Sequence, residues 1–86
     1  MPYIKDSRRK DMDEIVDLMV KKQVAVDGDL NYILYKFCKY NVKPSYNNYK
    51  NYCGELSECA SEIRRRLTGP YEDTKVKENG DVYTCQ

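Results

Sequence analysis

The chain has 86 residues with a formal net charge of +1, four cysteines, nine tyrosines and no histidine or tryptophan. This length allows one domain, and a domain so small buries only about 60% of its unfolded surface, so a monomer is marginal. The near-zero charge lacks the basic excess of a nucleic-acid binder, and the missing histidine excludes Ser–His and Cys–His catalytic pairs.

The first predicted elements are an N-terminal arm and a helix. We expect residues 1–10 to form an arm that either docks loosely on its own chain or reaches over a neighbouring subunit. A helix is expected from Asp11 to about Val24, because Asp11 and Glu14 have the spacing of a capping box. Its expected apolar face consists of Met12, Ile15, Val16, Leu18 and Met19.

A second helix is predicted from Leu30 to about Asn41, after a turn at residues 26–29. Asp29 is its expected N-cap. The apolar residues recur at helical spacing and predict one core face, formed by Leu30, Ile33, Leu34, Phe37 and Cys38. The short connection at residues 41–44 favours antiparallel packing on the next helix.

The longest predicted helix runs from Ser45 to Gly69. Ser45 is a good N-cap, and Gly69 followed by Pro70 predicts the C-terminal stop. Three arginines, Arg64 to Arg66, occupy the predicted last turn, where cations suit the helix dipole. Spacings of three and four place seven residues on one stripe: Tyr46, Tyr49, Cys53, Leu56, Ala60, Ile63 and Leu67.

Residues 70–86 predict an ordered C-terminal tail, either extended or a small β-hairpin. Asn79-Gly80 lies between two short segments and is a strong hairpin turn sequence. The expected architecture is therefore all-α in one domain, with an arm at 1–10, a helical core at 11–69 and a tail at 70–86. In it, two shorter helices pack on the long third helix.

The cysteines lie at positions 38, 53, 59 and 85 and form no CxxC. These spacings do not suit zinc, and no metal site or cofactor is expected. The N-terminus has no signal-peptide core, and no run reaches membrane-spanning length. We expect a cytoplasmic protein with reduced thiols, three of them packed as small hydrophobes.

Several segments together resemble a family of small uncharacterised proteins of bacteriophages and their bacterial hosts. They are the opening MPYI, the GDLNYIL of residues 28–34, the GEL of residues 54–56, and the Pro70–Tyr83 segment PYEDTKVKENGDVY. The resemblance implies a phage-related origin and a helical fold. It carries no known activity, so no catalytic residue is transferred from it.

The residues at the junction of the long helix and the tail favour recognition chemistry. Arginine can grip phosphate, tyrosine can stack on a base, and Asn or Asp can bind base edges or ribose hydroxyls. The candidate ligand-binding residues are Arg64, Arg65, Arg66, Tyr71, Asp73, Asn79, Asp81 and Tyr83. The structural alternative is that the arginines cap the helix and pair with Glu62 or with acids of the tail.

We therefore expect a non-catalytic binding protein and a homo-oligomer, since the long stripe needs more neighbours than one chain supplies. The expected ligand is a small nucleotide-like signalling molecule of the host, sequestered by a phage protein in the host cytoplasm. One alternative is an inhibitor that binds a host protein and takes no small ligand. The third is an accessory protein for RNA or DNA, although the net charge makes generic nucleic acid an unexpected partner and no membrane is expected.

Overall fold

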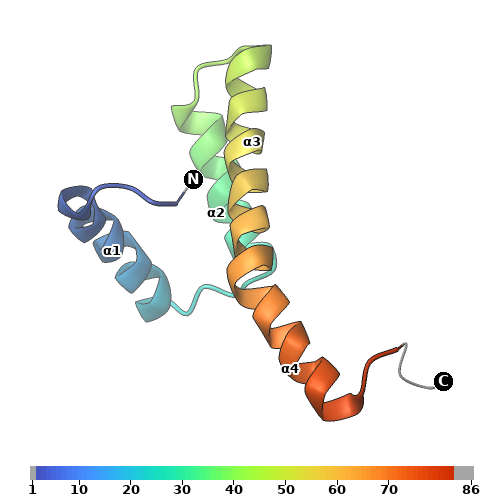
Figure 1. The fold of residues 1–86 in the computed structure, drawn as a ribbon. Coiled ribbons are helices and arrows are strands. Elements are labelled where there is room, and N and C mark those ends of the chain that lie inside the picture. The colour runs from blue at the N-terminus through green and yellow to red at the C-terminus, as the bar shows by residue number, and fades with distance from the viewer. Residues whose placement is uncertain (1, 83–86) are drawn as a thin grey trace. The chain divides into compact units, whose positions relative to one another are not determined.

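The computed structural model describes residues 2–82, and these are almost entirely helical (Figure 1). Helix α1 spans Asp6–Lys21, α2 spans Gly28–Asn41 and α3 spans Tyr46–Ile63. A π-helical turn, η1, covers Arg64–Thr68, and α4 covers Gly69–Asn79. The predicted all-α class is confirmed, and residues 2–82 contain no strand.

The chain divides by its internal contacts into two units, and each is described by itself. Residues 2–53 hold α1, α2 and the start of α3, and residues 54–82 hold the rest of α3, η1 and α4. No residue among those described is fully buried in either unit. A hydrophobic core of the ordinary kind is therefore missing from the described chain.

Helix α1 begins at Asp6, five residues before the predicted start, so residues 6–10 are helix and not an arm. Two ion pairs at i,i+3 spacing support this first part: Arg9 with Asp6 at 3.0 Å and Arg8 with Asp11 at 3.3 Å. The predicted capping role of Asp11 is thus wrong, because the residue lies inside the helix. Residues 6–10, which contribute to these ion pairs, are helical although the capping-box spacing predicted a helix start at Asp11.

The C-terminal end of α1 is a Schellman motif built on a residue other than glycine. Gln23 has φ 55°, in the left-handed region. Its N–H donates to the Val20 carbonyl at 3.0 Å, and the N–H of Val24 donates to the Met19 carbonyl at 3.0 Å. These are the two bonds that close a helix in this motif, so α1 ends before the predicted Val24.

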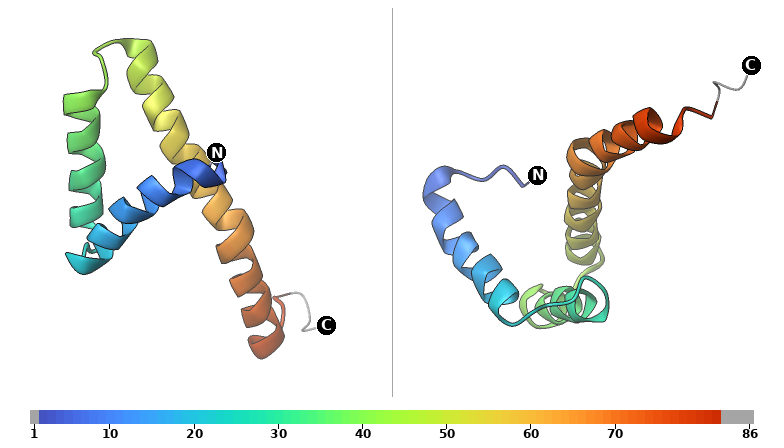
Figure 2. Two further views of the ribbon diagram at one scale, coloured as in Figure 1. Left: turned by 90° about the vertical axis from the view of Figure 1, so that its left-hand side faces the viewer. Right: turned by 90° about the horizontal axis from the view of Figure 1, so that it is seen from below.

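Helices α2 and α3 form a helical hairpin joined by a short connection (Figure 2). The predicted cap of α3 is confirmed, since the Ser45 hydroxyl accepts a hydrogen bond from the Asn48 N–H at 3.0 Å. The predicted cap of α2 is wrong. Asp29 lies inside that helix, and its carboxylate accepts from the Ala25 N–H at 3.0 Å.

The chain does not leave the helix at Gly69-Pro70, and the predicted stop and hairpin are wrong there. Residues 46–79 form a helical run of 34 residues, and residues 74–78, the predicted first hairpin strand, lie in α4. Gly69 has φ −58°, an ordinary helical value. Its N–H bonds to the Arg64 carbonyl, so the register lengthens to i→i+5 just before Pro70.

This π turn has a physical cause in the proline. Pro70 has no N–H, and in a regular helix its ring would meet the carbonyl four residues before it. The longer register before Pro70 places the proline in the first turn of α4, where its missing N–H costs nothing. A Cβ on Gly69 would lie 3.2 Å from the Arg64 oxygen, so glycine suits the tight backbone here.

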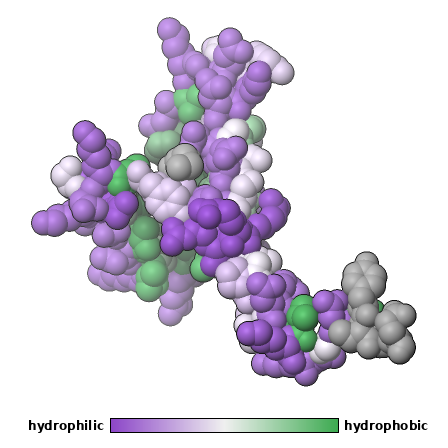
Figure 3. All heavy atoms as spheres, in the orientation of Figure 1, coloured by the Kyte–Doolittle hydropathy of each residue, from purple (hydrophilic) through white to green (hydrophobic). Residues whose placement is uncertain are grey.

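The residues of the predicted apolar faces do lie on helices, but their side chains are not buried within residues 2–82. On α1, Ile15 and Val16 are each 54% exposed. On the α3 stripe, Tyr46 is 80% and Leu67 is 65% exposed. Figure 3 shows apolar side chains reaching the surface among polar ones. The same holds for the thiols: Cys53 and Cys59 are exposed and only Cys38 is half-buried, so the predicted packing of three cysteines is wrong.

Candidate functional site

The three predicted arginines form most of the π turn η1, and one of them is held by an acid. Arg65 donates from Nε to Glu62 Oε1 at 2.9 Å and from a terminal nitrogen to Glu62 Oε2 at 3.0 Å. This two-point geometry satisfies the planar fork of the guanidinium. The pairing with Glu62, which the structural alternative predicted, is therefore present for Arg65.

The other predicted ligand-binding residues are spread along the helix that follows. Tyr71, Asp73 and Asn79 belong to α4, and Asp81 follows that helix. At 1.5 Å per residue, Arg64 and Asn79 lie about 20 Å apart along the helical run. The described part of one chain therefore does not gather these residues around one small ligand. Tyr83 lies outside the described residues.

Two side chains of α4, Lys75 and Thr74, contact neighbouring residues along the helix. The ammonium of Lys75 lies 5.5 Å from the ring centre of Tyr71 and 3.1 Å from Glu78. The Thr74 hydroxyl donates to the Pro70 carbonyl at 3.1 Å. Tyr71 is 59% exposed, so much of the residue remains accessible to solvent. Binding roles for this junction remain a prediction.

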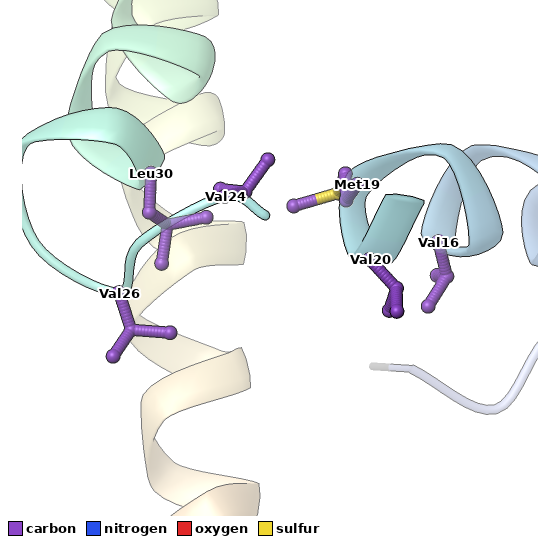
Figure 4. Close-up of a pocket in the computed structure, with 6 residues that line it drawn as sticks. All are labelled: Val16, Met19, Val20, Val24, Val26 and Leu30. Carbon is purple, nitrogen blue, oxygen red and sulfur yellow. The ribbon is translucent and has the colours of Figure 1, made fainter. Parts of the chain in front are cut away.

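An apolar depression lies where α1, the following connection and α2 meet (Figure 4). It has a volume of about 240 Å³ and is open to solvent. Its six lining residues are all apolar: Val16, Met19, Val20, Val24, Val26 and Leu30. A site whose lining side chains are all apolar has no polar side chain to orient a nucleotide, so this depression suits an apolar side chain from a protein.

The outward face of α2 carries a set of residues that the sequence reasoning missed as a group. We call it the Tyr–Lys face, and it consists of Tyr32, Tyr35, Lys36, Lys39 and Tyr40. The spacing i, i+3, i+4, i+7, i+8 places all five on one side of the helix. Lys36 lies 5.5 Å from the Tyr32 ring centre and 6.0 Å from that of Tyr40. The sequence signal for it is that residues 30–54 contain four lysines, six tyrosines and no acidic residue.

The opposite side of α2 contacts α3 through Tyr52. The Tyr52 hydroxyl donates to the Leu34 carbonyl at 2.6 Å, and its ring stacks on Phe37 with centres 6.4 Å apart. Desolvation by burial raises the pKa of the Tyr52 phenol, and the nearby Cys38 and Cys53 add to the rise. The residue is a structural contact between the two helices and leaves the Tyr–Lys face pointing away from α3.

Two further observations bear on the site. Residues 2–82 contain no group of three cysteine or acidic side chains that could hold a metal ion. Within the same range, no helix has both the length and the apolar character needed to cross a membrane.

Comparison with known proteins identifies a sequence family for the chain. It matches no curated protein and no solved structure. A family model described as "Domain of unknown function (DUF6899)" matches residues 1–82, nearly the whole length. The chain therefore belongs to the DUF6899 family.

Proposed function

We propose that this chain is a non-catalytic binding protein that completes its fold by association with a second copy of itself. The observation that carries the proposal is the absence of any buried residue among residues 2–82, despite apolar faces on α1, α2 and α3. Apolar surface left in water opposes folding, and covering it is the main favourable term in association. The function is then exerted by the assembled protein.

A second copy is the occupant that the charge pattern suits best. The net charge of +1 brings no long-range repulsion between identical chains. The face we assign to the interface is that of α1, where Ile15 and Val16 are each about half exposed. The apolar depression beside it accepts side chains of the partner.

Light scattering on purified protein tests this proposal. The expected mass is a multiple of 10.2 kDa. Val16→Glu should lower that mass, because a charge at the centre of an apolar interface is costly. Lys10→Gln changes the charge by the same amount on the polar side of α1 and should leave the mass unchanged. A monomeric wild type that melts cooperatively would contradict the proposal.

A small nucleotide-like ligand is the second candidate, with a phage setting suggested by the resemblance described above. The observation that favours it is the π turn at Arg64–Thr68, because π turns occur often at functional sites. Three consecutive arginines there provide charge for phosphate. In this version the assembled protein sequesters a signalling nucleotide of the host, and Asn79 and Asp81 come from a neighbouring chain.

Calorimetric titration with a panel of cyclic and linear nucleotides tests this candidate. Arg64→Ala and Arg66→Ala should each weaken binding by about 1.5–3 kcal/mol, the scale of a charge-assisted hydrogen bond. If these variants melt earlier than wild type but bind equally well, the arginines are structural and the second candidate fails.

A further inference from the structure

We propose that the Tyr–Lys face of α2 binds single-stranded nucleic acid. The face presents three exposed tyrosine rings, with exposures of 61% for Tyr32, 68% for Tyr35 and 70% for Tyr40. Exposed aromatic rings are the platforms on which unpaired bases stack, and lysines between them hold the phosphates. This inference does not depend on the oligomer or on the arginine junction.

The arrangement along α2 interleaves the two kinds of group. Lys36 stands one helical turn from Tyr32 and one from Tyr40, and its ammonium lies within 6.0 Å of both ring centres. It also lies 3.3 Å from the Tyr32 hydroxyl. Since Lys39 and Tyr35 share the face at four-residue spacing, ring and cation alternate over two turns of helix. A strand laid along α2 meets both types of contact repeatedly.

The local charge differs from the charge of the whole chain. No acidic residue occurs between Leu30 and Gly54, while Lys36, Lys39, Lys43 and Lys50 all lie in that stretch. Residues 30–54 therefore carry four positive charges, while the acids of α2 and α3 lie outside this stretch, at Asp29, Glu55, Glu58 and Glu62. The expectation that nucleic acid is an unlikely partner came from the total charge of +1, which does not describe this stretch.

Two alternatives fit the face less well. A protein interface would bury Lys36 and Lys39 at its centre, yet lysine is depleted in interface cores. A duplex keeps its bases stacked inside, out of reach of tyrosine rings on a convex helix, so the face favours unpaired strands. Few lysines are involved, so binding depends on stacking more than on charge.

Fluorescence anisotropy with labelled oligothymidylate and oligouridylate of about 16 nucleotides, the upper site size of one small domain, tests this inference. Wild type should bind both strands more tightly than a duplex of the same length. With two or three phosphate contacts, the logarithm of affinity should fall with that of salt at a slope of about −1.5 to −2. No binding at low salt would overturn the inference.

The decisive variants compare two lysines that each lie beside a tyrosine ring, although Lys75 also pairs with Glu78. Lys36 and Lys75 each lie 5.5 Å from the ring centre of a tyrosine one turn before them, and both are on helices. Lys36→Glu should weaken binding about tenfold or more, whereas Lys75→Glu, which makes the same change in net charge, should leave it nearly unchanged. Equal losses would assign the binding to total charge and overturn the proposal.

The tyrosines are tested in the same assay. Tyr32→Phe keeps the ring and should bind like wild type, while Tyr32→Leu keeps the apolar surface without the ring and should bind about tenfold more weakly. Circular dichroism of each variant checks that α2 is still helical. If Tyr32→Leu binds strands as well as wild type, its ring does not stack on a base and the inference is wrong. If Lys36→Glu alters the mass of the assembly without affecting strand binding, the face is a protein interface and the inference is wrong.

Discussion

The Tyr52 hydroxyl donates a hydrogen bond of 2.6 Å to the main-chain oxygen of Leu34, 18 residues away in the sequence. This bond joins α3 directly to α2, and the Tyr52 ring adds a stacked contact with Phe37. The Tyr52 side chain is half-buried. Tyr52 is therefore the residue on which the geometry of the α2–α3 hairpin depends most directly.

Tyr52→Phe should lower the free energy of unfolding by about 1 kcal/mol, the net value of one hydrogen bond in a folded protein. The ring and its contact with Phe37 remain, so the loss isolates the hydroxyl. Urea unfolding followed by circular dichroism at one protein concentration measures it. Tyr46→Phe, at a position 80% exposed, is the control and should change nothing. Equal effects of the two variants would contradict the role of the bond.

Stability should also decrease at alkaline pH in a way that Tyr52 explains. Burial raises the pKa of its phenol, so the folded state favours the neutral form. The contribution is complete below the ordinary tyrosine pKa of about 10 and is lost as the pH rises through the higher folded value. The difference in free energy of unfolding between wild type and Tyr52→Phe should become smaller as the pH rises above the ordinary tyrosine pKa of about 10. A difference that stays constant up to strongly alkaline pH would show that Tyr52 titrates normally.

Gln23→Gly should stabilise the protein by about 0.5–1 kcal/mol. Gln23 has φ 55° at the C-terminal end of α1, and a residue with a Cβ is strained in that region. Glycine adopts it without steric cost, although part of the gain is lost as chain entropy in the unfolded state. Thermal unfolding measures the change, with Lys22→Gly inside the same turn as the control, which should destabilise. Destabilisation by Gln23→Gly would mean that α1 ends differently.

Pro70→Ala should convert the π turn into regular α-helix. The longer register exists because Pro70 cannot donate a hydrogen bond and its ring needs room. The stability should change by only about 1 kcal/mol or less, because Pro70 already sits in the first turn of α4 and alanine adds freedom to the unfolded chain. Carbonyl chemical shifts of residues 64–69 report the register. Pro44→Ala, before α3, is the control. A π turn that persists in Pro70→Ala would require another cause.

Much of the helical architecture is predictable from the sequence, because the helices follow apolar periodicity and Ser45 caps α3 as expected. The boundaries were harder. The first part of α1 contains the exposed pairs Arg9–Asp6 and Arg8–Asp11, and each such pair is weak, so its effect on a helix start is hard to predict from the sequence. At Gly69-Pro70 the sequence offers a stop, yet one turn of π-helix lets the chain continue. Such a local change of register leaves no periodic pattern to detect.

The candidate site was also predicted only in part from the sequence. The pairing of Arg65 with Glu62 was an expected alternative, since the two lie three residues apart on a helix. The predicted gathering of tail residues near the arginines depended on a sharp turn at Pro70, and α4 extends away along the helix axis instead. The spacing of the Tyr–Lys face can be recognised in the sequence, but the near-neutral total charge argued against a nucleic-acid site there.

The central claim, that the chain completes its fold with a second copy, is tested most directly by the concentration dependence of unfolding. If folding and association are coupled, the urea midpoint should rise steadily as the protein concentration increases, because mass action stabilises the assembly. Val16→Glu should lower the midpoint more at low concentration than at high concentration, and Lys10→Gln should follow wild type. A cooperative transition whose midpoint is independent of concentration would show that a single chain folds alone and would contradict the claim.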